Sequence, residues 1–521
     1  MGPTYDILIS NGIVCDGTGS EPYPADICIT GCSIALISER SNSRAPRYLR
    51  GKKIIDATDL IVAPGFIDTH GHSEFTLLAD PRAEGKISQG ITTEINGNCG
   101  LSAAPLIGEA FRQREADLAE YGISDRWDTF GEYFLLLGKR VPALNVATLT
   151  GHGNLRACVA GYRDSGLTES ERKIMHGLLK DSLREGSFGI STGLIYPPGM
   201  YADSAELLDI CRVLVNACEG ANCIYTSHMR SEGERLIESI EETIAISRGS
   251  GIKVHISHLK TSGERNWHKI DQALSIIDEA RVDGVAVTCD RYPYTAASTD
   301  LDTLLPSWTY EGGSESELKR ILTPDTRRRI RAEIGTEHAD EEYWERVIVT
   351  SVLTEKNKWM EGRSVLSIAR RKRCDPVDTL LEILVEEKLR VGAIFLSMSE
   401  DNLAKILAKE YVMVGSDSAA RSFDGPTRRG KPHPRGFGSF PRFLRKPFLD
   451  DLQMNISEAI HKITLLPAMT FGMSQRGILR EGAYADITVF DRHKISDMAT
   501  YEDPFVKSEG VQFVIVNGTP A

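Results

Sequence analysis

Short apolar runs recur along the middle of the chain, and stretches with the spacing of amphipathic helices separate them. The runs have the length and the β-branched content of buried strands. Strands that alternate with helices imply a parallel sheet with crossover helices. In chain order the runs are LIVAPGFID, GITTEINGNCG, LNVATLTGHGN, SFGISTGLIYPPG, NCIYTSHM, IKVHISHL, GVAVTCDRYPY and YVMVGSDS. Because there are eight of them, the sequence predicts an α/β fold with a closed (β/α)8 barrel.

A doubly wound open sheet is the alternative interpretation of this alternation. It is disfavoured because no Gly-x-Gly-x-x-Gly turn follows an early run. From about residue 300 to 392 the alternation stops at a charged segment that contains TPDTRRRIRAEIG and the strand-like run VIVTSV. We interpret this segment as a partly helical insertion before the last barrel strand and as a candidate lid. Its arginines are typical of a solvated helix face.

The two ends of the chain share a different pattern, with short β-rich runs between Gly and Asp turns. These runs are YDILISNGIVCDGTG and ADICITGCSIALIS near the start, and GAYADITVFD and GVQFVIVNG near the end. We expect residues 1–62 and 472–521 to form one small β-sandwich domain. Residues 63–471 would then form the barrel and its insertion.

Charge and composition exclude several classes of protein. The chain has 521 residues and a formal net charge of −12, so a nucleic-acid binder, which needs a basic face, is not expected. No apolar run is long enough to cross a bilayer, and the first residues lack a secretory signal pattern. The cysteines are scattered without a Cys-x-x-Cys motif. We therefore expect reduced thiols and a cytoplasmic protein, and the oligomeric state stays open.

Residues of the types that bind metal ions stand at the ends of five of the apolar runs. In a (β/α)8 barrel the carboxyl ends of the strands meet at one face, so these side chains are expected to converge. They are His70, His72, Cys99, His228, His258 and Asp417. Imidazole and thiolate ligands favour zinc over magnesium or calcium. Each residue alone is explained as well by a structural role, and His255 is left out because it lies an odd number of residues from His258 along a strand.

Nine longer motifs follow one another along nearly the whole chain. They are GFIDTHGHSE, NGNCGLSAAP, STGLIYPPGMYA, SHMRSEG, VHISHLK, DRYPYTAAST, VGSDS, KPHPRGFGSFPRFL and LPAMTFGMSQRGILREGAYADITVFD. In this order they resemble the N-acyl-D-amino-acid deacylase (D-aminoacylase) family of the amidohydrolase superfamily. The Cys99 segment and HPRGFGSFPR are the most specific parts. The resemblance implies a barrel with a small β-sandwich built from both termini, and zinc-dependent hydrolysis of the amide bond of N-acyl-D-amino acids.

The resemblance also implies how the metal ligands divide. Cys99, His228 and His258 hold the tighter zinc, and the other three predicted ligands face a second, weaker metal position that Cys99 can bridge. Many relatives in the superfamily bridge two metals with a carboxylated lysine after the fourth strand, but FGISTGLIYPPG contains no lysine. This difference disfavours enzymes of the dihydroorotase and hydantoinase type and favours a cysteine-based site.

Five residues are expected to act on the substrate or hold it. An amide nitrogen leaves only when it is protonated, so Asp417 is expected to take a proton from water and return it to the amine. A helix N-cap is its alternative role. By resemblance, Arg435 binds the α-carboxylate bidentately with help from Tyr292 and Ser298, and its alternative is a surface position. Lys260 is expected to touch the substrate, with a solvated charge as the alternative.

Two other functions stay open at this point. One is a related amidohydrolase that acts on a dipeptide or a cyclic amide, which the missing lysine and the presence of Arg435 disfavour. The other is a non-catalytic barrel protein, which would be expected to have lost metal ligands that this chain retains.

Overall fold

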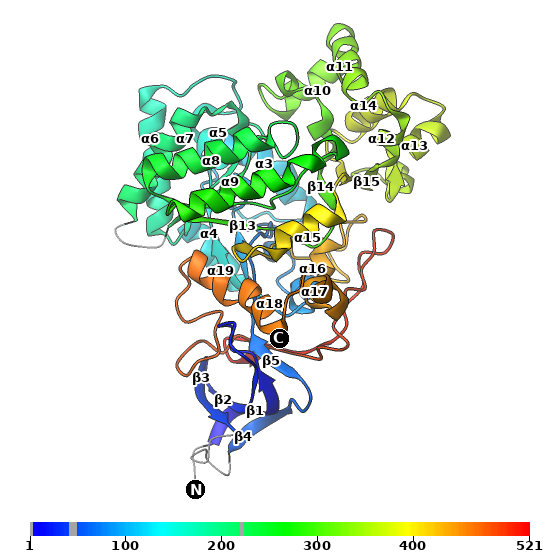
Figure 1. Ribbon diagram of the computed structural model, residues 1–521. Coiled ribbons are helices and arrows are strands. Elements are labelled where there is room, and N and C mark those ends of the chain that lie inside the picture. The colour runs from blue at the N-terminus through cyan, green and yellow to red at the C-terminus, as the bar shows by residue number, and fades with distance from the viewer. Residues whose placement is uncertain (1–3, 41–48, 219–222) are drawn as a thin grey trace.

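A sheet built from both ends of the chain lies at one end of the molecule, and the helix-rich remainder lies above it (Figure 1). The computed structural model describes residues 4–40, 49–218 and 223–521. Within these ranges, no helix combines the length and the apolar character that crossing a membrane requires.

The predicted apolar runs form parallel strands that make two sheets. The strands are β6 (Phe66–Asp68), β7 (Ile91–Asn96), β8 (Asn145–Thr148), β9 (Thr150–Gly151), β10 (Gly189–Gly193), β11 (Ile224–His228), β12 (Lys253–Ile256), β13 (Val287–Asp290) and β18 (Val412–Met413). One sheet has the order β6-β7-β8 and the other β18-β13-β12-β11-β10-β9. One residue separates β8 from β9, and a parallel bridge joins Gly71 to Ser418. The two sheets therefore meet at both ends of their strand order.

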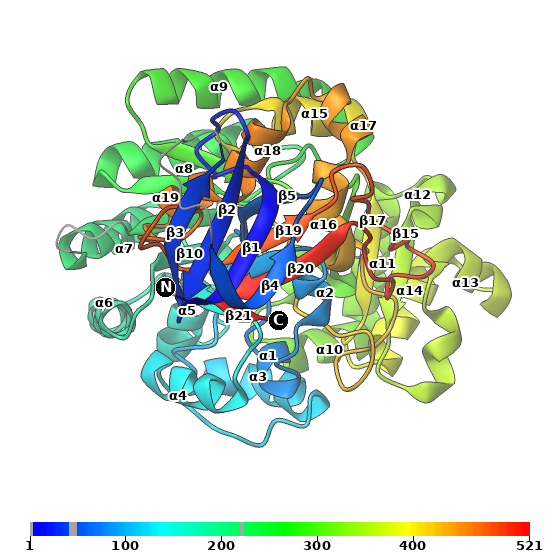
Figure 2. The ribbon, with the colours of Figure 1, turned by 90° about the horizontal axis from the view of Figure 1, so that it is seen from below.

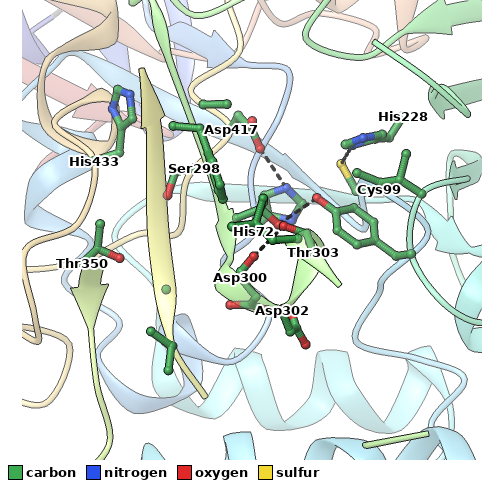
Figure 3. A pocket seen from close by; sticks show the side chains of 18 of the residues that line it. His72, Cys99, His228, Ser298, Asp300, Asp302, Thr303, Thr350, Asp417 and His433 are labelled. Atoms are coloured by element: carbon green, nitrogen blue, oxygen red, sulfur yellow. Dashed lines mark hydrogen bonds and ion pairs between the residues drawn. The ribbon is translucent and has the colours of Figure 1, made fainter. Parts of the chain in front are cut away.

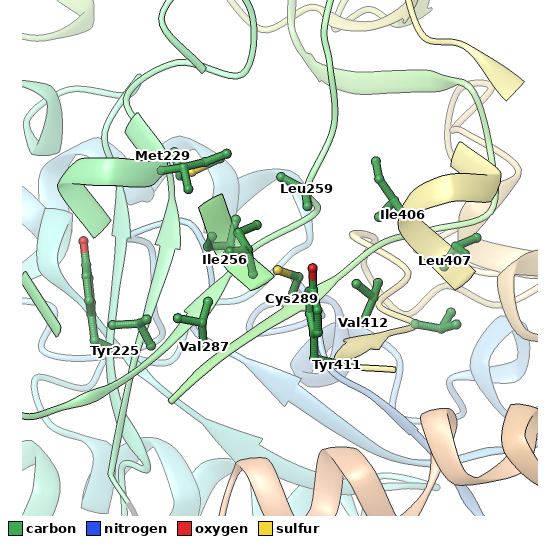
Figure 4. Packing of buried hydrophobic residues seen from close by; sticks show 14 of the residues in the cluster. Tyr225, Met229, Ile256, Leu259, Val287, Cys289, Ile406, Leu407, Tyr411 and Val412 are labelled. Carbon is green, nitrogen blue, oxygen red and sulfur yellow. The ribbon is translucent and has the colours of Figure 1, made fainter. Parts of the chain in front are cut away.

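Helices connect the parallel strands and pack against them. They are α1 (Thr76–Ala79), α2 (Glu84–Ile87), α3 (Glu109–Glu120), α4 (Phe130–Arg140), α5 (His152–Ala160), α6 (Glu169–Arg184), α7 (Ser204–Ala217), α8 (Leu236–Ser250), α9 (Ile270–Val282), α15 (Glu400–Ala408), α16 (Arg435–Leu444), α17 (Lys446–Asp451), α18 (Ile456–Ile463) and α19 (Leu465–Thr470). Figure 4 shows the packing: Val287 and Val412 of the strands lie in one buried cluster with Ile406 and Leu407 of α15. Burial of such side chains stabilises the fold by about 1.5–3 kcal/mol each.

The two ends of the chain share one sheet, as Figure 2 shows from below. Its strands are β1 (Thr4–Val14), β2 (Tyr23–Thr30), β3 (Ser33–Glu39), β4 (Arg50–Asp56), β5 (Ile61–Pro64), β19 (Ile487–Phe490), β20 (Val511–Val516) and β21 (Thr519–Pro520). All eight belong to a single hydrogen-bonded sheet, whereas a sandwich was expected. The sheet is continuous because the long strand β1 pairs with β4 over its first part and with β5 at its end. A bulge between Ile9 and Gly12 interrupts the pairing of β1 with β2.

The charged segment between β13 and β18 has its own sheet and core. The sheet is antiparallel, has the order β14-β17-β15-β16 and includes the expected strand VIVTSV as β15. Its elements are β14 (Ala296–Asp300), α10 (Ser314–Leu322), α11 (Pro324–Glu337), α12 (Glu341–Glu345), β15 (Val347–Ser351), β16 (Arg363–Ser364), α13 (Val365–Lys372), α14 (Pro376–Glu386) and β17 (Gly392–Leu396). The segment projects from one side of the molecule (Figure 1), and a separate apolar cluster holds it together. The sequence predicted its helices but not the extent of its sheet.

One disulfide contradicts the expectation that all thiols are reduced. Cys218 and Cys223 are bonded, with their Cα atoms 6.2 Å apart, inside the normal range for a disulfide. The expectation rested on the lack of a Cys-x-x-Cys motif. Cys218 and Cys223 are five residues apart, so a search for that motif does not find them.

A buried ammonium joins the first parallel strand to the last. The Lys86 side chain is fully buried, and its Nζ lies 2.6 Å from Asp68 Oδ2, 3.2 Å from Glu94 Oε1 and 2.7 Å from Ser416 Oγ. Asp68 ends β6, Glu94 lies in β7 and Ser416 follows β18. Because the two carboxylates are fully buried as well, they depend on the one ammonium for neutralisation.

We predict that Lys86→Met strongly destabilises the protein. The substitution leaves Asp68 and Glu94 as buried carboxylates without a counter-charge, which typically costs about 3–5 kcal/mol. The measurement is the free energy of unfolding from urea denaturation. Lys52→Met is the control, because Lys52 forms an exposed ion pair with Asp6 and its loss should change stability little. Equal stability of Lys86→Met and the parent would contradict the prediction.

Candidate metal centre and substrate pocket

The six predicted metal ligands come together at the carboxyl ends of the parallel strands. Their ligand atoms form two groups, and within each group all atoms lie within 4.8 Å of one another. One group is His70, His72, Cys99 and Asp417, and the other is Cys99, His228 and His258. Cys99 is the member that the two groups share.

The Cys99 sulfur lies between three imidazoles. Its Sγ is 3.3 Å from His70 Nε2, 3.5 Å from His228 Nδ1 and 3.4 Å from His258 Nε2. Burial alone would raise the pKa of the Cys99 thiol, but the charges of His70 and His258 hold this pKa well below its usual value. A thiolate is the form that binds metal ions. The other ring nitrogen of His228, Nε2, is buried and forms no hydrogen bond with any residue that the structure describes.

Three of these ligands have a strained backbone. Cys99, His258 and Asp417 have φ angles of 54°, 36° and 51°. Residues other than glycine and asparagine rarely adopt this left-handed region, and strain of this kind concentrates at functional sites. The alternative role of Asp417 as a helix N-cap is wrong, because the next helix in the described part of the chain, α16, begins only at Arg435.

Asp290, which was not selected from the sequence, orients His70 through the ring nitrogen that faces away from Cys99, and it also contacts His255. Asp290 Oδ2 lies 3.3 Å from His70 Nδ1 and 2.8 Å from His255 Nε2, and Asp290 Oδ1 accepts the His258 backbone N–H at 2.6 Å. Burial opposes ionisation of Asp290, but His70 and His255 hold its pKa well below the usual range. His255 therefore supports the site from outside the two ligand groups.

Glu232 orients the His258 ring in the same way that Asp290 orients His70. Its Oε1 lies 2.8 Å from His258 Nδ1, which leaves Nε2 of the same ring to face Cys99. The Lys260 ammonium contacts the same Glu232 oxygen and is only 3% exposed. The alternative of a solvated Lys260 is therefore wrong. Burial would raise the pKa of Glu232, but Lys260 and His258 hold it well below the usual range.

Asp417 stands between the metal ligands and the arginine that was expected to bind substrate. Its Oδ1 lies 3.2 Å from His72 Nε2, and its Oδ2 lies 2.9 Å from Arg435 Nη1. Burial disfavours the charged carboxylate, but Arg435 and then His258 and His72 hold its pKa well below the usual range. Asp417 is therefore ionised, which is the form that accepts a proton.

Arg435 is buried beside the other predicted substrate residues. The side chain is 5% exposed, so the surface alternative is wrong. Its Nη2 donates to the Ser298 carbonyl at 3.2 Å, and its guanidinium carbon lies 4.6 Å from the centre of the Tyr292 ring. Among the described residues, neither the Arg435 Nε nor the Tyr292 hydroxyl has a hydrogen-bond partner. Burial would raise the pKa of Tyr292, but the charges of Lys260, Arg291 and Arg435 lower it overall.

His433 positions this arginine, although no sequence signal singles it out within KPHPRG. Its Nε2 donates to the Ala296 carbonyl at 3.0 Å, and its Nδ1 accepts the Arg435 backbone N–H at 2.9 Å. Burial first, and then the charge of Arg435, hold the pKa of His433 well below its usual value. A neutral ring that accepts at Nδ1 and donates at Nε2 fits both contacts.

A cavity of about 1270 Å³ opens over these residues. Figure 3 shows Cys99 and His228 at one side of it, Asp417 beside Ser298, and Asp300 and Asp302 below them. Tyr196, whose hydroxyl lies 3.0 Å from Thr299 Oγ1, joins the inserted segment to the rest of the pocket. The candidate site is therefore a metal-binding cluster at the bottom of a deep pocket, with an arginine and a lysine beside it.

Comparisons with known proteins agree with this geometry. The model of the amidohydrolase family matches residues 53–521. The chain is 37% identical to N-acyl-D-glutamate deacylase of Alcaligenes xylosoxydans xylosoxydans, over 99% of this chain and 94% of that protein. It is 34% identical to D-aminoacylase of the same organism, over 99% of this chain and 94% of the other.

A solved structure is similar over the same length. N-acyl-D-glutamate deacylase from Bordetella bronchiseptica, in complex with zinc and a phosphonate mimic of the tetrahedral intermediate, has a TM-score of 0.83 and 33% identity, covering 99% of this chain and 96% of that one. The chain therefore belongs to the amidohydrolase family, and within it to the group of the N-acyl-D-amino-acid deacylases (D-aminoacylases).

Proposed function

We propose that this protein hydrolyses the amide bond of N-acyl-D-amino acids with the help of bound zinc, and releases a carboxylate and a free D-amino acid. The observation that carries the proposal is the arrangement around Asp417, which lies 3.2 Å from a predicted metal ligand, His72, on one side and 2.9 Å from Arg435 on the other. Asp417, the candidate base for water, thus contacts Arg435, the candidate residue for binding the substrate carboxylate. The names of the similar proteins support the reaction and the handedness of the substrate.

The residues present suit zinc. Cys99, His228 and His258 would hold the tighter ion, because two imidazoles and a thiolate that converge within 4.8 Å are a typical ligand set for zinc with one open position. The second group, with His70, His72 and Asp417, would hold a weaker one. When bound, zinc polarises an amide carbonyl and lowers the pKa of a water molecule.

The chain itself supplies the proton transfers. Asp417 is ionised and lies at the edge of the ligand cluster, so it can take a proton from the attacking water. The same carboxyl group then returns the proton to the amide nitrogen, which leaves as an amine. Arg435 contacts Oδ2 of Asp417, and Oδ1 lies beside His72, so Oδ1 is the oxygen that faces the metal ligands and the attacking water.

The substrate carboxylate would bind to Arg435. Its Nε lacks a partner, as does the Tyr292 hydroxyl beside it, so two donors are available for one α-carboxylate. Ser298 lies on the same side of the pocket, and we propose that Ser298 and Lys260 complete the binding site. With the carboxylate and the scissile amide both fixed, inversion at Cα exchanges the side chain with hydrogen, so one enantiomer must be disfavoured.

We also propose that the two parallel sheets close into a (β/α)8 barrel over residues 63–471. Support comes from the single residue between β8 and β9 and from the Gly71–Ser418 bridge. Residues 1–62 and 472–521 would form the small β-domain, and residues 300–392 an insertion that covers the pocket as a lid.

Replacing Cys99 with alanine should remove most of the zinc. Without the thiolate, the tighter group retains two imidazoles, and two ligands bind zinc far more weakly than three. The measurement is zinc per chain by elemental analysis. Cys211→Ala is the control, because Cys211 is buried within α7, away from the ligands, and should keep its zinc. A Cys99→Ala protein with parental zinc and activity would show that the cysteine-based site is wrong.

Asp417→Asn should lower kcat while most of the tightly bound zinc remains. The amide cannot accept the proton of the water, and a general acid–base group contributes roughly 10²–10⁴-fold. Steady-state kinetics with N-acetyl-D-amino acids, alongside zinc content and unfolding temperature, test this. Turnover at the parental rate would refute the role of Asp417.

Arg435→Lys should weaken catalysis on substrates that carry a free α-carboxylate. Lysine cannot form the bidentate pair, and loss of a charged hydrogen bond costs roughly 1.5–3 kcal/mol in kcat/KM. The test compares N-acetyl-D-amino acids, their L-forms and their carboxamides on parent and variant. Equal parental rates on acid and carboxamide would contradict the role of Arg435. Faster parental turnover of the L-forms would contradict the D-specific assignment.

A further inference from the structure

Three carboxylates line the part of the pocket that the inserted segment contributes. Asp300 ends β14, Asp302 lies in the 3-10 helix that follows it, and Glu317 lies in α10. Asp300 and Asp302 lie close together in Figure 3, below His72 and apart from Cys99 and His228. We call these three residues the acidic wall.

Glu317 has an unfilled hydrogen-bonding position in this pocket. Its side chain belongs to a residue that is only 4% exposed, and its Oε1 has no hydrogen-bond partner within the described part of the chain. A buried carboxylate oxygen without a partner is unfavourable. A donor that enters the pocket would satisfy it.

The arginines near Asp300 form their ion pairs with other carboxylates and act on the wall only from a distance. Arg114 Nη1 lies 3.0 Å from Asp117 Oδ2, and Arg390 Nη1 lies 2.7 Å from Asp117 Oδ1 while the same guanidinium contacts Glu120. These cations are therefore engaged with other carboxylates.

Asp300, Asp302 and Glu317 form no ion pair at 4.0 Å or less with a described residue. Burial first, and repulsion between neighbouring carboxylates second, raise the pKa of Asp302 to about 8 and that of Glu317 to about 9. At neutral pH Asp302 and Glu317 are therefore protonated when no cation is bound. A bound ammonium lowers their pKa and favours the ionised form, which makes the charged hydrogen bond. Asp300 is exposed to the open pocket.

The strand β14 places the wall at a defined distance from the substrate carboxylate. Ser298 and Asp300 are two residues apart on β14, so they share a face and lie about 7 Å apart along the strand. In the proposed function, Ser298 and Arg435 bind the α-carboxylate. Asp300 then lies about as far from it as the ammonium at the end of a four-methylene lysine side chain.

We propose that the acidic wall selects substrates with a positive charge on their variable part and disfavours acidic D-amino acids. This inference rests on the proposed function and names its substrate class. The charge can be on the side chain of the D-residue, as in lysine, or on an amine at the end of the acyl group. Either one would bind to Asp300, Asp302 and Glu317 through charged hydrogen bonds.

The test measures kcat/KM of the zinc-loaded parent on matched pairs of substrates. One pair is Nα-acetyl-D-lysine and Nα-acetyl-D-norleucine, and the other is 6-aminohexanoyl-D-norleucine and hexanoyl-D-norleucine. In at least one pair the cationic member should be better by about tenfold or more, the usual effect of a charged hydrogen bond. Nα-acetyl-D-glutamate should be a poorer substrate than Nα-acetyl-D-norleucine. The two pairs also tell which end of the substrate carries the charge.

Variants test which residues discriminate. Asp300→Asn and Asp302→Asn should each lower the ratio of cationic to neutral kcat/KM by about tenfold. Glu315→Gln, an exposed acid on the same α10 as Glu317, should leave this ratio unchanged. Because each variant is read as a ratio on one preparation, partial loss of folded protein cancels.

The inference and the proposed function can fail separately. If the parent turns over Nα-acetyl-D-norleucine but shows no preference for either cationic substrate, or prefers D-glutamate, the inference is overturned and the proposed function stands. Unchanged ratios in both Asn variants also overturn the inference. If no N-acyl-D-amino acid is a substrate, both are overturned. The comparison of cationic with neutral substrates uses the parent protein, so its outcome does not depend on whether a variant folds.

Discussion

The position of one buried thiolate among three imidazoles is the constraint on which the rest of the site depends. Cys99 adopts a left-handed backbone, and Gly97 and Gly100 beside it have φ angles of 79° and 74°. A Cβ at Gly100 would lie 2.7 Å from the Gly193 backbone nitrogen, so the segment packs directly against β10. The NGNCG motif is thus needed to bring the sulfur into the centre of the pocket, where its charge holds His70 and His258 in place.

The charged groups around this sulfur alternate in sign with distance from it: the thiolate contacts imidazoles, the imidazoles contact carboxylates, and one carboxylate contacts a lysine. His70 and His258 each turn one ring nitrogen to Cys99 and the other to a buried carboxylate, Asp290 or Glu232. Such outer partners fix the tautomer and the orientation of metal-binding histidines. Lys260 in turn contacts Glu232. Each buried charge therefore has a neighbour that compensates it, which explains how so many ionisable groups remain buried in one place.

The sequence predicted what lies at strand ends better than what approaches from outside. His70, His72, Cys99, His228, His258 and Asp417 could be identified because parallel strands bring their carboxyl ends together. Asp290 also ends a strand and was overlooked, although the same rule applies to it. Glu232 and His433 could not be found this way, because they lie on loops whose folding depends on contacts far apart in sequence.

Contacts that join distant segments also explain the remaining differences in the fold. The single sheet at the two termini depends on β1 changing its partner from β4 to β5, and no local pattern in the sequence encodes such a change. The sheet of the inserted segment likewise pairs β14 with β17, strands that lie almost a hundred residues apart.

The edge of β14 that pairs with no other strand of this sheet contacts the residues of the proposed substrate site. Its Ala296 and Ser298 carbonyls accept hydrogen bonds from His433 and Arg435, so the residues that protect this sheet edge are the same ones that, in the proposed function, bind or position the substrate carboxylate. Asp300, one member of the acidic wall, ends that strand. In the proposed function the distance between the substrate carboxylate and Asp300 is therefore set by the rise of one β-strand and not by a movable loop, so that a substrate would be recognised by the spacing of its own charges.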